Sequence, residues 1–170
     1  RIFIIISGLT FGWNQCIEGE EVELWGVCYD IGTTTSLYLP DSGLTGEIPD
    51  SLGLLTNLIS IILPFNQLNG EIPQTIINLT ELHILDLRNN EMTGEIGILS
   101  DLINLTGLYL SDNYFAGQIP EDIGNLDHLI ELEIDNNNLS ENIPTSIGDL
   151  RDLRELYLYN NQISGEIPEN

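Results

Sequence analysis

The chain has 170 residues, of which 42% are hydrophobic, so it can bury a core as one domain or as one piece of a larger protein. Its 27 acidic residues are accompanied by only four arginines, which gives a net charge of −23. This charge excludes nucleic acid as a partner, because phosphates would be repelled, and it disfavours direct contact of this segment with an anionic membrane. A cationic partner or cations remain compatible with it.

The first residues indicate export. Arg1 precedes an apolar run at residues 2–6, and small residues follow within residues 7–12. This order is that of the end of a secretory signal peptide, so residues 1–12 are predicted to be the remnant of one. A short buried strand is the alternative. No later stretch reaches the roughly 18 consecutive apolar residues that a membrane span requires.

Residues 13–33 contain both tryptophans and both cysteines of the chain, Trp13, Cys16, Trp25 and Cys28. Two thiols 12 residues apart lack the close pairs and the four ligands of a zinc site, so a disulfide is the better interpretation if the protein is exported. We interpret the tryptophans as apolar cover for the core that follows, in preference to a platform on which a ligand stacks.

Residues 34–170 contain six copies of one unit. The phrase Gly-Glu-Ile-Pro, or a variant of it, begins at positions 46, 70, 94, 117, 141 and 165, so successive copies are 24, 24, 23, 24 and 24 residues apart. The units share the pattern L-x-x-L-x-L-x-x-N-x-L-x-G-x-I-P. The alternating leucines predict a short strand with one buried face, which a single unit cannot cover alone. Stacked units bury it as a continuous apolar column beneath a parallel sheet, and the column includes Leu63, Leu87, Leu110, Ile134 and Leu158.

An asparagine follows each predicted strand after the first, where the chain turns inward and its backbone amides lose contact with water. A side-chain amide can both donate and accept hydrogen bonds, so stacked copies are predicted to form a ladder that satisfies these turns. Ser42 occupies this position in the first unit. The predicted asparagine ladder consists of Asn66, Asn90, Asn113, Asn137 and Asn161.

The third unit is one residue short. Its phrase, Gly94-Glu95-Ile96-Gly97, lacks the proline, and the missing residue falls after the phrase, on the variable side of the unit. We expect a local distortion there and an undisturbed strand in the next unit. The sixth unit is incomplete at Asn170, so we expect the chain to be a fragment of a longer protein.

The shared pattern, its G-x-I-P ending and its length of 24 residues resemble the plant-type class of leucine-rich repeats. This class occurs in plant receptor-kinase ectodomains, in polygalacturonase-inhibiting proteins and in similar secreted bacterial and protist proteins. The resemblance covers about residues 34–170. It implies an α/β-type solenoid, a curved right-handed stack with a parallel sheet on the concave face and short 3-10 or irregular segments on the convex face.

Residues 13–33 are similar to the N-terminal cap of this class, where W-x-G-V-x-C is typical. Here Trp25-Gly26-Val27-Cys28 has two residues between the tryptophan and the cysteine, where that motif has four. The resemblance implies a cap over the first repeat, tied by a Cys16–Cys28 disulfide that contributes roughly 2–3 kcal/mol of stability.

The concave face is the predicted partner-binding surface. On a leucine-rich-repeat strand, the residues that alternate with the buried leucines face outward on that side. A broad, rigid face of this kind suits recognition, and tyrosine is enriched at interface hot spots. The predicted binding residues are Tyr38, Ile62, Asp86, Arg88, Tyr109, Glu131, Glu133, Asp135, Glu155, Tyr157 and Tyr159.

Three acidic residues of one strand region, Glu131, Glu133 and Asp135, are spaced by two and therefore share this face. Three interpretations are open. The residues are a calcium candidate, because hard cations prefer carboxylate oxygens, or they are a docking patch for a basic partner, or they are simply a solvated acidic face. The sequence does not indicate an enzyme. Carboxylates about 6.8 Å apart along an open strand imply no cleft, so no catalytic residue and no cofactor is predicted.

Three N-x-S/T sequons begin at Asn78, Asn104 and Asn138, and the first two are the better glycosylation candidates in a eukaryotic host. By resemblance, the chain is expected to act outside the cell or on its surface and to recognise a protein, peptide or carbohydrate. Two alternatives stay open: an inhibitor of an extracellular hydrolase, and a structural or adhesive repeat, with or without calcium, in a larger surface protein.

Overall fold

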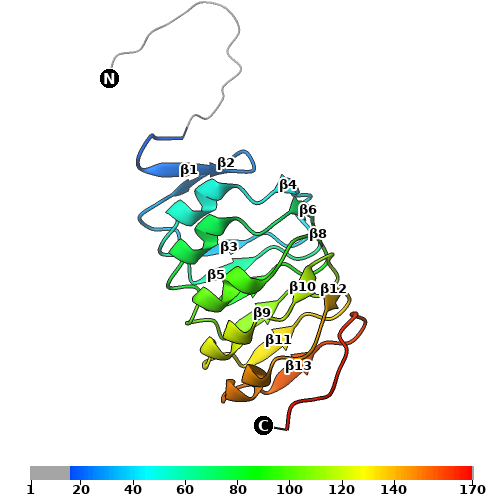
Figure 1. Ribbon diagram of the computed structural model, residues 1–170. Helices are drawn as coiled ribbons and strands as arrows, with labels where there is room; N and C mark the ends of the chain where they lie inside the picture. The colour runs from blue at the N-terminus through cyan, green and yellow to red at the C-terminus, as the bar shows by residue number, and fades with distance from the viewer. Residues whose placement is uncertain (1–15, 170) are drawn as a thin grey trace, which may run out of the picture.

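The computed structural model describes residues 16–169, which form a stack of short strands and 3-10 helices (Figure 1). The predicted signal remnant at residues 1–12 and Trp13 lie outside the described residues, and the predicted boundaries of the cap and of the six repeats remain predictions. In the part of the chain that is described, no helix has the length and apolarity needed to cross a membrane.

The stack begins with an antiparallel hairpin of β1 (Glu21–Leu24) and β2 (Val27–Asp30). Its two-residue turn places both Trp25 and Gly26 in the left-handed region, with φ of 48° and 81°. Such turns match the right-handed twist of the strands. The Trp25 side chain packs against the hydrophobic core, as expected of an apolar cover.

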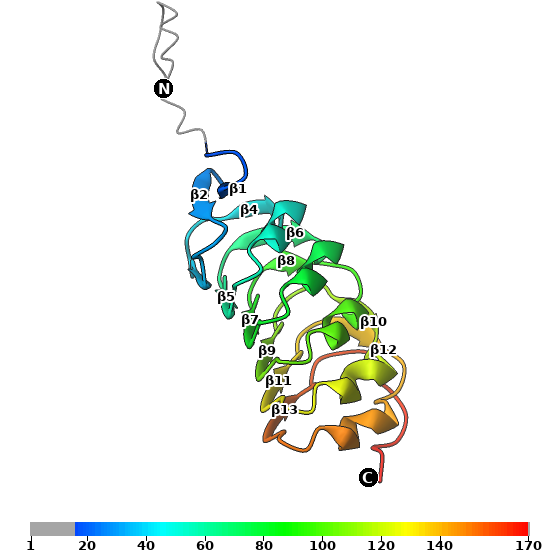
Figure 2. The ribbon, with the colours of Figure 1, turned by 90° about the vertical axis from the view of Figure 1, so that its left-hand side faces the viewer.

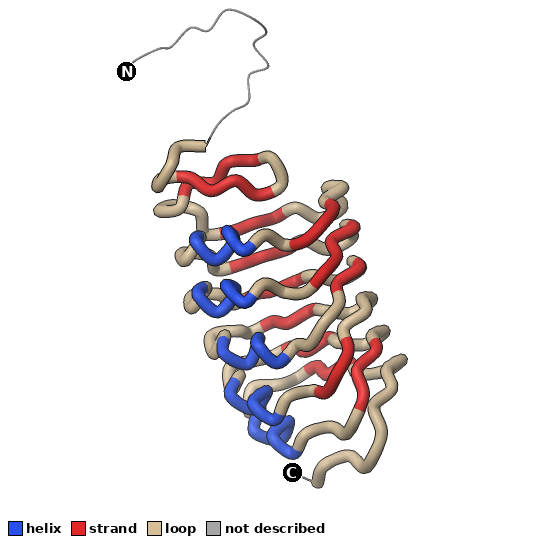
Figure 3. The backbone as a smooth tube through the Cα atoms, turned by 45° about the horizontal axis from the view of Figure 1, so that its top comes forward, coloured by secondary structure: helices blue, strands red, loops and turns tan. Residues whose placement is uncertain are grey.

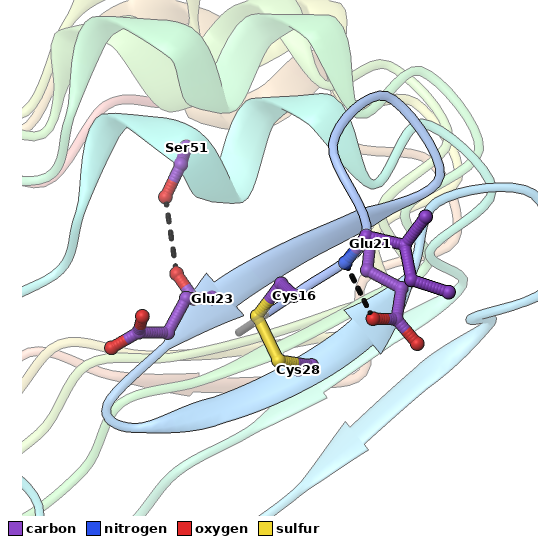
Figure 4. Close-up of a disulfide and its surroundings, with 6 residues drawn as sticks. Cys16, Glu21, Glu23, Cys28 and Ser51 are labelled. Atoms are coloured by element: carbon purple, nitrogen blue, oxygen red, sulfur yellow. Dashed lines mark hydrogen bonds between the residues drawn. A yellow bond between two sulfur atoms is a disulfide. The ribbon is translucent and has the colours of Figure 1, made fainter. Parts of the chain in front are cut away.

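The Cys16–Cys28 disulfide is present and joins the segment before β1 to β2 (Figure 4). The prediction of this bond is therefore confirmed. Beside it, the Ile17 N–H donates to Glu21 Oε2 at 2.9 Å, and the Ser51 hydroxyl reaches the Glu23 carbonyl at 3.5 Å. Disulfide and hydrogen bonds together hold the hairpin above the first 3-10 helix, which contains Ser51.

Six parallel strands form one sheet in the order β3, β5, β7, β9, β11, β13, and every neighbouring pair is in register. The central residues of the first five strands, Leu37, Ile61, Leu85, Leu108 and Leu132, are buried, whereas Leu156 in β13 is 39% exposed. The column from Leu63 to Ile134 is buried as predicted, while Leu158 is half-buried. The strand bounds are Ser36–Tyr38, Ser60–Ile62, Ile84–Asp86, Gly107–Tyr109, Glu131–Glu133 and Glu155–Tyr157.

Five 3-10 helices line the side of the solenoid opposite this sheet (Figure 2). They are η1 (Asp50–Leu54), η2 (Gln74–Asn78), η3 (Gly97–Asp101), η4 (Glu121–Asn125) and η5 (Thr145–Asp149). Prolines precede all of them except η3, because proline fixes the φ that opens the turn. The predicted solenoid, with its sheet on the concave face and short helical segments on the convex face, is thus confirmed.

Along the flank, the strands that follow the ladder positions of the first five repeats pair in two further parallel sheets (Figure 3). One contains β4 (Thr45–Glu47), β6 (Gln67–Gly70) and β8 (Glu91–Met92), and the other contains β10 (Ala116–Gln118) and β12 (Asn138–Ser140). The division between β8 and β10 falls at the short third repeat.

The expected distortion of the third repeat is observed at Ile96. Its backbone has φ −97° and ψ 1°, whereas the prolines before the other four helices have ψ between 142° and 149°. The chain therefore bends into η3 immediately after the isoleucine and saves one residue. Strand β9 in the next repeat pairs in full register with β7 and β11, so the concave sheet is undisturbed.

The recurring phrase places its first residue in the left-handed region in every repeat. Gly117 is an example, with φ 83°, and an added Cβ there would lie 3.1 Å from Glu95 Cγ of the preceding repeat. The fifth copy has Glu141 instead of glycine and still adopts φ 65°. Because side chains are strained in this region, Glu141 is a local cost in stability.

A candidate recognition surface on the concave face

The asparagine ladder supports the edge of the concave face. The Asn113 side chain accepts a hydrogen bond from the Met92 N–H at 2.9 Å and donates to the carbonyls of Leu87 at 2.9 Å and Leu110 at 3.1 Å. Each of these carbonyls also accepts from a neighbouring ladder asparagine, Asn90 or Asn137. Successive repeats thus share their acceptors, which fixes the strand ends in one register. Asn66, Asn90, Asn137 and Asn161 make equivalent bonds, and the ladder is present as predicted.

The residue before each ladder position adopts a left-handed backbone, with φ between 47° and 59°. We call these residues the left-handed row: Asp41, Phe65, Asn89, Asp112, Asn136 and Asn160. Asparagine and aspartate tolerate this conformation better than other residues with a side chain, whereas phenylalanine does not. Phe65 is nevertheless 60% exposed, so burial of its ring does not compensate for the strain.

Arg88 connects three strands of the face. Its guanidinium donates twice to Asp86, at 3.0 and 2.8 Å, and once to Glu133 at 2.9 Å. In reaching from β7 to β11 it lies over the ring of Tyr109 on β9, with its central carbon 4.8 Å from the ring centroid. The hydrogen bonds to Asp86 are the main reason that the pKa of Arg88 is raised above its ordinary value, so this charge is permanent.

Tyr109 lies flat on the sheet because Gly107, two residues earlier, has no side chain. A Cβ at Gly107 would be 2.7 Å from Tyr109 Cε2. The Tyr109 hydroxyl donates to Glu131 Oε2 on the next strand. Burial, followed by this hydrogen bond and the charge of Glu131, raises the pKa of Tyr109 well above its ordinary value. The ring is therefore a neutral floor between Arg88 and the acidic strand.

Asp135, directly beyond β11, is buried at 5% exposure. One carboxylate oxygen accepts from the Ser111 hydroxyl at 2.5 Å, and the other accepts from the Asn136 side chain at 2.7 Å. Next to it, Tyr159 is 57% exposed, and a hydrogen bond to Asp135 raises the pKa of Tyr159. On β13, Tyr157 donates to Glu155 at 3.1 Å, which raises the pKa of Tyr157.

The first two strands of the concave face carry no charged side chain. Ser36 and Ser60 share a hydrogen bond of 2.7 Å, Tyr38 is 68% exposed and Ile62 is half-buried. The face therefore changes from neutral at β3 and β5 to acidic at β11 and β13.

A hollow of about 340 Å³ runs along the end of the strands from the second repeat to the sixth. It combines members of the left-handed row with the arginine and carboxylates described above and with two tyrosines. Its lining residues are Phe65, Arg88, Asn89, Ser111, Asp112, Glu133, Asp135, Tyr157 and Tyr159.

Comparison with known proteins identifies the family. A family model described as leucine rich repeat matches residues 103–163. Among solved structures, the leucine-rich-repeat ectodomain of the receptor kinase SOBIR1 from Arabidopsis thaliana matches with a TM-score of 0.70 and 35% sequence identity, over 74% of this chain and 68% of that one. The chain belongs to the plant-type leucine-rich-repeat proteins. Comparison with curated protein sequences gave no significant match.

This leucine-rich-repeat chain also resembles parts of longer receptors. The plant peptide hormone receptor RGFR1, solved in complex with RGF2, matches with a TM-score of 0.77 and 38% identity over 79% of this chain. The Arabidopsis receptor kinase HAESA, solved with the peptide hormone IDA and the co-receptor SERK1, matches with a TM-score of 0.71 and 39% identity over 74% of this chain. The chain spans only 22% and 21% of those two chains.

The predicted binding residues of the leucine-rich-repeat face lie where the repeat pattern placed them, but two are not open to a partner. Asp86 is buried beneath Arg88, and Asp135 is buried behind Ser111, because each carboxylate is needed to satisfy a neighbour inside the protein. Phe65 and Asn89 of the left-handed row line the hollow and are not among the predicted binding residues, whereas Asp112, which the sequence predicts near the acidic strand, lines it as well. The asparagine or aspartate before the ladder position was the available signal, and Phe65 departs from it.

The calcium candidate is not assembled in this leucine-rich-repeat structure. Glu131, Glu133 and Asp135 share a face, but each carboxylate is directed to a different partner, Tyr109, Arg88 and Ser111. Within residues 16–169, the one group of potential metal ligands that converges is Cys16, Glu21 and Cys28, whose two sulfurs are bonded to each other.

The sequons differ in their surroundings, and glycosylation at any of them remains a prediction. Asn78 ends η2 with an exposed side chain, and Asn138 is exposed in β12. Asn104 is half-buried and donates to the Thr80 carbonyl at 2.8 Å, which ties it to the preceding repeat.

Proposed function

We propose that this chain is an extracellular recognition module that binds a protein or peptide partner on its concave face. The observation that carries the proposal is the hollow along the strand ends, where exposed aromatic side chains and carboxylates stand on a frame fixed by the asparagine ladder. Exposed aromatic rings beside polar groups on a rigid surface are the features of a binding hot spot.

The similar structures support a peptide or protein partner in preference to a carbohydrate. RGFR1 and HAESA are each solved with a peptide hormone, and HAESA also with a co-receptor. Inhibition of a hydrolase and a purely structural role remain predictions that no feature of the concave face specifically favours.

Selection from a random display library of twelve-residue peptides tests the proposal. The folded chain, with its disulfide intact, is the bait. Peptides recovered on it should lose binding to the double variant Tyr157→Ala/Tyr159→Ala, because these exposed rings supply contact area without supporting the core.

The matched control is Leu54→Ala, which removes a similarly exposed apolar side chain from η1 on the convex side. It should leave binding unchanged. Recovery of no peptide, or equal losses in the control and the double variant, would show that the concave face is not the recognition surface. Thermal unfolding of each variant establishes that it is folded.

A further inference from the structure

We infer that the hollow selects an extended peptide in which a lysine or arginine lies beside Asp112 and Glu133 and an apolar side chain, three residues away, packs against Phe65. The inference rests on the proposed function and specifies the chemistry of its partner.

Charge complementarity identifies the basic residue. Arg88 is the one cation that lines the hollow, and Asp86 binds it through two hydrogen bonds from below. Glu133 shares the Arg88 charge with Asp86 through one hydrogen bond of 2.9 Å, so Asp112 and Glu133 together have less than one positive charge to balance them. Asp112 is exposed, and its carboxylate has no ion-pair partner in the described part of the chain. A cationic side chain placed here gains attraction from both carboxylates.

The surroundings favour a guanidinium or ammonium group on a long stem over a free metal ion. The carboxylates do not converge closely enough for a metal, as described above. Tyr157 and Tyr159 border the acidic region of the hollow, and aromatic rings can cover the methylene groups of a lysine or arginine.

The exposed ring of Phe65 is the reason to expect an apolar side chain in the bound peptide. Its ring is exposed at the edge of the hollow in spite of a left-handed backbone that phenylalanine disfavours. Three other members of the left-handed row are asparagine, so the fold itself does not require an aromatic ring at this position. An exposed ring at one end of a hollow is a natural contact for an apolar side chain.

The spacing follows from the repeat. Phe65 and Asp112 occupy the same position two repeats apart, and neighbouring strands are about 4.8 Å apart, so the two backbone positions are separated by about 10 Å. In a polyproline II segment, three residues advance about 9.3 Å and return to the same face. A β-strand returns to the same face after about 7 or 13 Å, which fits less well. The geometry therefore favours positions i and i+3 of a polyproline-like peptide.

The test uses peptides recovered from the display library described above. Their sequences should be enriched in an apolar residue three positions from a lysine or arginine. The variant Asp112→Asn should bind the tightest-binding synthetic peptide with about fivefold lower affinity, because one exposed charge pair is lost. A peptide with glutamine in place of its basic residue should bind the unchanged chain with a similarly reduced affinity. The variant Phe65→Asn should reduce the affinity for this peptide by about fivefold or more.

The chain contains matched controls. Asparagine already occupies the position of Asp112 in three other repeats, so the substitution leaves the backbone intact. Asp41→Asn changes the same repeat position outside the hollow and should alter affinity less than twofold. Recovered peptides that depend on Tyr157 and Tyr159 but not on Asp112 would overturn this inference and leave the proposed function standing. Recovery of no concave-dependent peptide would overturn both.

Discussion

Replacement of Asn113 by alanine should destabilise the solenoid by about 3 kcal/mol. Besides Leu87 and Leu110, Asn113 donates to the Ser111 carbonyl at 3.3 Å. Each of these three carbonyls keeps another donor: Asn90 for Leu87, Asn137 for Leu110, and the Asn89 N–H for Ser111. The buried Met92 N–H, by contrast, loses its acceptor. An unpaired buried N–H costs about 1–3 kcal/mol, and the lost donations and the small cavity add about 1 kcal/mol more. For a chain of this size, the midpoint of thermal unfolding should fall by about 6–12 °C.

Chemical denaturation measures the total loss in the free energy of unfolding, and hydrogen exchange shows which amides lose protection. The Met92 amide should lose protection in the Asn113→Ala protein while the amides of β3 keep theirs. Asn161→Ala is the matched control, because Asn161 makes equivalent bonds but is only partly buried in the last described repeat, where water can replace it. Its cost should be below about 1 kcal/mol. Equal losses in the two variants would refute the argument that burial gives the ladder its value.

Three further predictions concern single features. Glu141→Gly should stabilise the chain by about 0.5–1 kcal/mol in urea unfolding, because relief of the left-handed strain exceeds the added chain entropy; a loss of stability would contradict this. The double variant Cys16→Ser/Cys28→Ser should lose about 2–3 kcal/mol, and reduction of the native protein should give the same loss, with no further effect of reductant on the variant. The pKa of Tyr109 is raised in the folded state, so the neutral hydroxyl contributes stability that is fully present below about pH 10 and is lost as the pH rises toward the folded pKa. The variant Tyr109→Phe should therefore show a smaller decline in the free energy of unfolding above about pH 10. An unchanged decline would refute this assignment.

The repeat period explains why the fold could be predicted from sequence. A spacing of 24 residues with alternating leucines allows one way of burying the apolar face, and the strands from β3 to β13 follow it. The ladder was also predictable, because a side-chain amide such as that of Asn113 supplies both a donor and an acceptor at a buried turn. The place of the distortion in the third repeat was also predictable, since a missing residue is most easily accommodated away from the strands.

The local chemistry of the face was less predictable. Periodicity places Asp86, Arg88 and Glu133 on one surface, but it does not say that the arginine crosses a strand to join them. That arrangement depends on Gly107, which allows Tyr109 to lie flat beneath the guanidinium. The burial of Asp86 likewise follows from a particular side-chain conformation and not from the repeat pattern.

The bend at Ile96 has an evolutionary consequence. The chain loses a residue on its back, the flank sheets separate there, and the front sheet continues in unbroken register. A change of one residue in length before η3 is therefore compatible with an unbroken concave sheet. The front can diversify by substitution alone while the back diversifies in length, so a lineage of such proteins can change what it recognises and how it is built independently of each other.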